Sequence, residues 1–133
     1  MNVISVVTGL FLIAHGLVHI LYRIPAPDEK WPFDLSYSWL LTRLGLRTQV
    51  LKGLGTVLWM AALTGFVLGG LGALGVPVSK EFWRMDTAVS AVISFVLIGL
   101  FWHRNFWFAL LMNAGIFISL IWIHWPTIEM IGW

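Results

Sequence analysis

Four long apolar segments, none of them interrupted by proline, leave few folds open to this sequence. They cover residues 3–22, 50–71, 85–102 and 105–125. A helix needs about 20 apolar residues to cross roughly 30 Å of hydrocarbon at about 1.5 Å per residue. Because a helix pairs its own backbone polar groups in lipid, we expect an all-α fold: a four-helix transmembrane bundle forming a single domain over residues 1–133.

Composition excludes the usual soluble classes. Hydrophobic residues make up 59% of the 133 residues and charged residues 11%, against roughly 25% charged in ordinary globular domains. A formal net charge of +2, spread along the chain, is too small for a nucleic-acid-binding surface, so we expect no nucleic-acid partner. The absence of cysteine excludes disulfides and thiolate metal sites. The lipid bilayer is the partner that composition predicts.

Basic residues are divided unequally between the two ends of the predicted bundle. Two of the eight lie between the second and third segments, and six flank the other two connections: Arg23, Lys30, Arg43, Arg47, Lys52 and Arg104. The positive-inside rule then places both termini outside the cytoplasm. We expect an integral protein of a bacterial or archaeal plasma membrane.

The longest connection has a helical pattern of its own. Tyr37, Leu40, Leu41 and Leu44 recur at i, i+3, i+4 and i+7. This spacing predicts a short interfacial helix in the first cytoplasmic loop, lying on the leaflet. The alternative is an ordinary loop helix packed across the mouth of the bundle.

Small residues at four-residue spacing predict where the spans approach one another. Ala61, Gly65 and Gly69 form one stripe on the second span, and Ser90 and Ser94 form another on the third. Small residues let helices in lipid come close enough for dispersion contacts. The same stripe could equally serve a homo-oligomer contact.

Two histidines lie inside the first span, where ionisable side chains are costly and suggest a function. His15 and His19 are four residues apart, and therefore on one face of a helix. Neutral imidazoles so placed can bind a metal, ligate haem with a partner helix, donate to a quinone carbonyl or pass a proton. The structural alternative is that each bonds to a neighbouring helix. We favour that alternative, with extension to the headgroups, for His19, and a functional role for His15.

Each span contributes one polar side chain at a similar depth. Measured from the cytoplasmic edge at about 1.5 Å per residue, His15, Thr56, Ser94 and Asn113 lie roughly 9 to 12 Å deep. Pointing inward, they would form a polar pocket covered by apolar rings, including Trp59. We hypothesise that His15 and Asn113 share a site, because a carboxamide at this depth needs several partners. Chance alignment of polar residues is the alternative.

His103 ends the third span at a depth close to that of His19. This pair is a candidate for haem ligation, so the metal or haem candidates are His15, His19 and His103, with no metal specified. No Ser-His-carboxylate relay lies at one depth, so we assign no catalytic residue.

The run Gly9–Leu17, with the sequence GLFLIAHGL, resembles the first helix of DoxX-like proteins. These are small four-span membrane proteins in which a similar apolar stretch ends in His-Gly. Some relatives are linked with quinone-coupled sulfur oxidation or redox homeostasis, and the resemblance makes His15 the position carried over. The family commonly has Gln-Lys after His-Gly-Leu, where this chain has Val18 and His19, so a shared ligand is not implied.

These features predict a small redox-associated membrane protein that binds a quinone-like or other lipophilic ligand in the polar layer, with quinone or haem as the possible cofactor. In this hypothesis His15 donates a hydrogen bond to the ligand and Asn113 orients it. One alternative is an accessory subunit of a larger membrane complex. The other is an oligomeric transporter of small solutes or ions, because one protomer offers no polar path across the outer halves of its spans.

Overall fold

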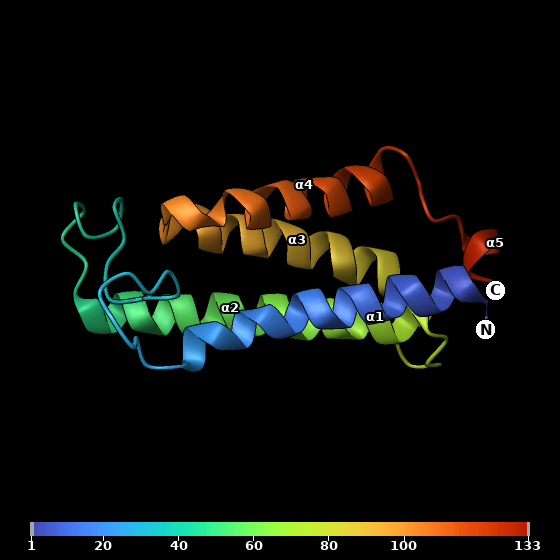
Figure 1. The fold of residues 1–133 in the computed structure, drawn as a ribbon, viewed down its shortest axis with the longest axis horizontal. Coiled ribbons are helices and arrows are strands. Elements are labelled where there is room, and N and C mark those ends of the chain that lie inside the picture. Colours follow the sequence, from blue (N-terminus) through green and yellow to red (C-terminus); the bar gives the residue numbers. More distant parts are fainter. Residues whose placement is uncertain (1, 133) are drawn as a thin grey trace.

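The computed structural model describes residues 2–132, and this part of the chain is all-helical. Four of its helical segments are long and apolar enough to cross a membrane, which confirms the predicted class. The elements are α1 (Val3–Leu17), its 3₁₀ continuation η1 (Val18–Arg23), α2 (Thr48–Ala73), α3 (Trp83–Leu100), η2 (Arg104–Phe106), α4 (Trp107–Ile121) and α5 (Ile128–Ile131). The long helices alternate in direction, so both ends of the chain lie at the same end of the bundle (Figure 1).

The last span is shorter than predicted. It ends at Ile121, four residues before the expected boundary at Trp125. Trp125 precedes Pro126, whose ring disfavours helical geometry at the residue before it, and His124 has a left-handed backbone with φ 57°. The chain therefore turns before α5, whose Ile131 is fully buried beside the start of α1.

α2 lies between α1 and α3 and approaches both closely through glycines. A Cβ on Gly70 would lie 2.7 Å from the carbonyl oxygen of Gly9 on α1. On the other side, a Cβ on Gly65 would overlap the hydroxyl of Ser90, and a Cβ on Gly69 would overlap the hydroxyl of Thr87. The small-residue stripe therefore marks a helix contact, as its spacing predicts, within this one chain.

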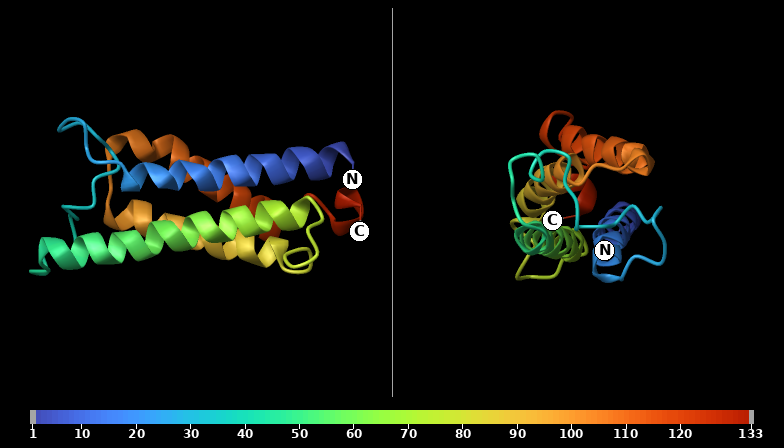
Figure 2. Two further views of the ribbon diagram at one scale, coloured as in Figure 1. Left: turned by 90° about the horizontal axis from the view of Figure 1, so that it is seen from below. Right: turned by 90° about the vertical axis from the view of Figure 1, so that its left-hand side faces the viewer.

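α4 packs mainly on α3, and α1 packs mainly on α2. Figure 2 shows the order in its end-on view, where α1 and α4 occupy the two ends of a curved row of helices. The seam between α1 and α4 is consequently the least tightly packed boundary of the bundle, and it holds the site described below.

The loop over residues 24–47 corrects the prediction of a short interfacial helix. Residues 39–45 form consecutive turns, with i+4 hydrogen bonds from the amides of Thr42 and Leu44. The hydroxyl of Ser38 accepts from the amide of Leu41 and donates to the carbonyl of Leu100, and Gly45 ends the turns with φ 81°. Tertiary hydrogen bonds therefore take the place of a regular helix here.

This loop also covers the end of α3. The last carbonyls of a helix have no partner within it, and here Leu100 accepts from Ser38 while Gly99 accepts from the indole of Trp39 at 2.7 Å. Leu35, 7% exposed, packs into the space beside Gly55 on α2. The loop thus lies across the mouth of the bundle, while Tyr37 stays exposed.

The contact between α1 and α2 leads to a first prediction. Gly70→Ala should lower the free energy of unfolding by about 1–3 kcal/mol, because the new methyl would meet backbone atoms that cannot move aside. The control is Gly53→Ala on the same helix, where a Cβ meets nothing within 4 Å, so stability should be unchanged or slightly higher. SDS-induced unfolding followed by circular dichroism compares the two, and equal stabilities would contradict this packing.

Candidate functional site

Four polar side chains from three different helical segments form one hydrogen-bonded chain inside the bundle. Nε2 of His15 lies 2.9 Å from Oδ1 of Asn113, and Nδ2 of Asn113 lies 2.8 Å from Oγ of Ser94. The same Oγ lies 2.9 Å from Nε2 of His19, whose Nδ1 lies 3.1 Å from the carbonyl oxygen of Gly16. We call these side chains the His15–His19 network.

The network is buried and covered by an aromatic ring from the remaining helix. Asn113 and Ser94 are 0% and 1% exposed, and both histidines are buried. Phe66 of α2 packs edge-on against His15 at 4.7 Å between ring centroids and lies 5.8 Å from His19. The network therefore hydrogen-bonds three spans to one another where lipid offers no partner, and Phe66 adds a ring contact from the fourth.

The direction of every hydrogen bond in the network follows from its last acceptor. The carbonyl of Gly16 can only accept, so Nδ1 of His19 carries a proton, and in a neutral ring its Nε2 must accept from the Ser94 hydroxyl. Ser94 then accepts from Nδ2 of Asn113, which leaves the amide oxygen to accept from Nε2–H of His15. No carboxylate among residues 2–132 hydrogen-bonds either histidine, and the neutral ring is the form that such burial favours.

His19 lies in η1, where the first span changes from α-helical to 3₁₀ geometry. Its ring donates to the carbonyl of Gly16, and a side-chain donor competes with the backbone for a carbonyl of the preceding turn. The tighter 3₁₀ turn still leaves the rings of His15 and His19 edge to face, with centroids 5.9 Å apart.

Two cavities lie end to end along the seam between α1 and α4. A small one of about 40 Å³ adjoins the network and is lined by His15, His19, Asn113 and Tyr22, among others. It has room for water but not for a ring-sized ligand. The larger one, of about 360 Å³, lies nearer the termini.

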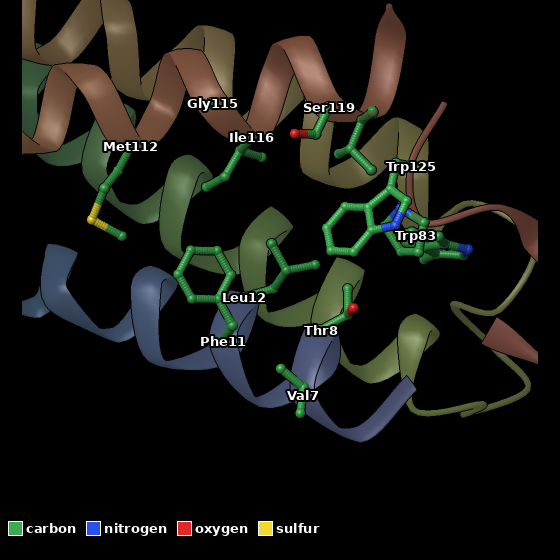
Figure 3. Close-up of a pocket in the computed structure, with 12 residues that line it drawn as sticks. Val7, Thr8, Phe11, Leu12, Trp83, Met112, Gly115, Ile116, Ser119 and Trp125 are labelled. Carbon is green, nitrogen blue, oxygen red and sulfur yellow. The ribbon is translucent and has the colours of Figure 1, made fainter. Parts of the chain in front are cut away.

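We call the larger cavity the α1–α4 crevice, and its walls are almost wholly apolar. Its lining includes Val7, Phe11 and Leu12 from α1, Met112, Gly115 and Ile116 from α4, and Trp83 and Trp125 (Figure 3). Figure 3 shows Phe11 and Leu12 directed toward Met112 and Ile116 across the seam. The ring of Phe11 also stacks on His15, with centroids 6.1 Å apart, so Phe11 contacts both the crevice and the network.

Two of the residues predicted for the polar layer lie elsewhere. Thr56 and Trp59 line a different cavity, of about 470 Å³, together with Arg23 and Lys52 at the loop end of the bundle. The two side chains lie at a depth similar to that of His15, but neither lines the cavity beside Asn113 and no hydrogen bond joins either to the network within residues 2–132. The structure thus brings together His15, Asn113 and Ser94, and not Thr56 or Trp59.

The predicted metal and haem ligands are engaged in other contacts. His103 accepts from the amide of Asn105 and caps η2, while both ring nitrogens of His19 are used within the network. Across the described residues, no group of three His, Cys, Asp or Glu side chains is arranged to hold a metal. Any haem on His19 would first have to displace Ser94.

The alternative favoured for His19 is confirmed in one part and wrong in the other, and two aromatic residues were not predicted. His19 bonds to Ser94 of another helix, as that alternative predicts, but at 7% exposed it does not extend toward the headgroups. Its i, i+4 spacing from His15 was the available signal. Phe11 and Phe66 enclose His15 on two sides, and an apolar side chain inside an apolar span carries no signal of such a role.

Comparisons with known proteins add no relative. The chain matches no family model, and no curated protein or solved structure resembles it to a significant degree.

The network leads to a second prediction. Asn113→Leu should lower the free energy of unfolding by about 1–3 kcal/mol, because His15 loses its acceptor and Ser94 loses its donor in a buried site. Ser119→Ala on the same helix removes a hydroxyl that forms no side-chain hydrogen bond within residues 2–132, and it should change stability little. SDS unfolding separates the two, and a wild-type stability for Asn113→Leu would show that the network is not stabilising.

Proposed function

We propose that this protein is a small redox-associated membrane protein that binds a quinone-like or other lipophilic ligand in the α1–α4 crevice, with the polar end of the ligand at His15. The observation that carries the proposal is the position of an apolar cavity of about 360 Å³ next to a buried polar network. Ligand sites commonly combine apolar walls with a few convergent polar groups.

Cavity size decides which part of the ligand lies where. Small-molecule sites have volumes of about 300–1,000 Å³, a range that includes the crevice and excludes the 40 Å³ cavity. The ring and tail of a ligand therefore belong in the crevice, and only its polar group reaches past Phe11 to His15. This differs from the initial hypothesis, in which the whole ligand occupied the polar layer.

A quinone-like ligand is favoured by the likeness of the first span to DoxX-like proteins, some of which are linked with quinone-coupled oxidation. The distribution of Lys and Arg favours both termini outside the cytoplasm. In that orientation the network lies in the cytoplasmic half of the membrane and the crevice in the outer half.

The proposal predicts quenching of tryptophan fluorescence by a short-chain benzoquinone in reconstituted protein. Trp83 and Trp125 line the crevice and are the expected reporters, whereas Trp59 lies in a different cavity. Gly115→Phe should abolish the saturable part of the quenching, because a side chain at Gly115 enters the crevice without meeting any atom within 4 Å at its Cβ.

The matched control is Gly53→Phe, which adds the same side chain at another open helical glycine outside the crevice. It should quench like the wild type. Quenching that does not saturate, or that is equal in the two variants, would reject ligand binding in the crevice.

A further inference from the structure

The His15–His19 network has one ring nitrogen without a hydrogen-bond partner among residues 2–132, and this nitrogen is an acceptor. The neutral ring of His15 uses its only N–H, at Nε2, on Asn113. Nδ1 therefore carries a lone pair, and the structure gives it no hydrogen-bond partner among residues 2–132. Within residues 2–132 the fully buried side-chain atoms without a partner are the hydroxyl of Tyr22 and Nε1 of Trp31. Nδ1 of His15 is not one of them, so this atom is unpaired but not fully buried.

The other members of the network offer a ligand nothing. Both ring nitrogens of His19 are bonded, and Ser94 both donates and accepts. Asn113 has a second amide hydrogen, but its side chain is 0% exposed. His15 is 9% exposed and stacks on the crevice residue Phe11, so it is in ring contact with the wall of the crevice.

From this balance of donors and acceptors we infer that the site selects ligands whose polar group donates a hydrogen bond. The class is a lipophilic hydroxyl compound, such as a quinol or another ring-bearing alcohol, in preference to the corresponding carbonyl or ether. This inference rests on the proposed function and names the ligand class for the same crevice. It also reverses the initial expectation that His15 donates to a quinone carbonyl.

The selectivity comes from the free-energy cost of placing two hydrogen-bond acceptors against each other away from water. A ligand carbonyl facing the lone pair of Nδ1 would place two acceptors together away from water, whereas a hydroxyl satisfies both groups. If His15 carried its proton on Nδ1, its Nε2 would have to accept from Asn113, and the bonds among Asn113, Ser94 and His19 would all have to reverse. Nδ1 of neutral His19 would then have no proton to donate to the carbonyl of Gly16.

Two ligands that differ only in the donor test the inference without redox chemistry. The probes are 4-dodecylphenol and its methyl ether, supplied at equal mole fractions to the reconstituted protein and counted on it by native mass spectrometry. The phenol should be bound about five- to tenfold more than the ether, the ratio expected for one neutral hydrogen bond. In His15→Phe, which keeps a ring but removes the acceptor, the preference should disappear.

The outcomes separate this inference from the proposed function. Equal binding of both probes, lost in Gly115→Phe, overturns the donor preference and leaves crevice binding intact. If neither probe binds, and the wild type therefore behaves like Gly115→Phe, the crevice is rejected as a ligand site.

A second measurement on the wild-type protein needs no variant to fold. ¹⁵N NMR of histidine-labelled protein should show His15 protonated at Nε2 and His19 protonated at Nδ1, as the hydrogen-bond directions require. A proton on Nδ1 of His15 would overturn the inference directly.

Discussion

Lipid supplies no hydrogen-bond partners, so polar side chains inside the bundle must pair with one another, as His15 and Asn113 do. α4 packs mainly on α3, and within residues 2–132 the hydrogen bond between His15 and Asn113 is the one that joins α4 to α1 across the seam. Asn113 also bonds to Ser94 of α3, and Ser94 bonds in turn to His19 of the first span. The position of α4 relative to α1, and hence the shape of the crevice, depends on a network in which each member satisfies the next.

The distribution of glycine explains why the cavity lies where it does. Gly70 and Gly65 let α2 press against α1 and α3 until backbone and side-chain atoms meet. The single glycine of α4, Gly115, faces open space, with nothing within 4 Å of a built Cβ. Across this seam larger side chains such as Phe11 and Met112 hold the helices apart, so the volume that close packing removes elsewhere remains here as the crevice.

Hydropathy and the helical rise were enough to predict the four spans, because both depend on position along the chain alone. Depth along the spans likewise anticipated that His15, Ser94 and Asn113 lie at one level. Thr56 shares that level but faces another cavity, since the rotation of a helix about its axis is decided by packing, here by the glycine faces of α2. The loop turns over residues 39–45 depend on Ser38 reaching a carbonyl 62 positions away, which no local pattern encodes.

The crevice opens on the side of the bundle, where its lining residues Val7 and Phe11 are 61% and 43% exposed. Those side chains contact acyl chains, not water, in a membrane-embedded bundle. A guest molecule would thus arrive by diffusing sideways within the leaflet. Occupancy would be governed by abundance per lipid, so that enriching the membrane in a compound fills the crevice even when almost none of it is dissolved in the surrounding water.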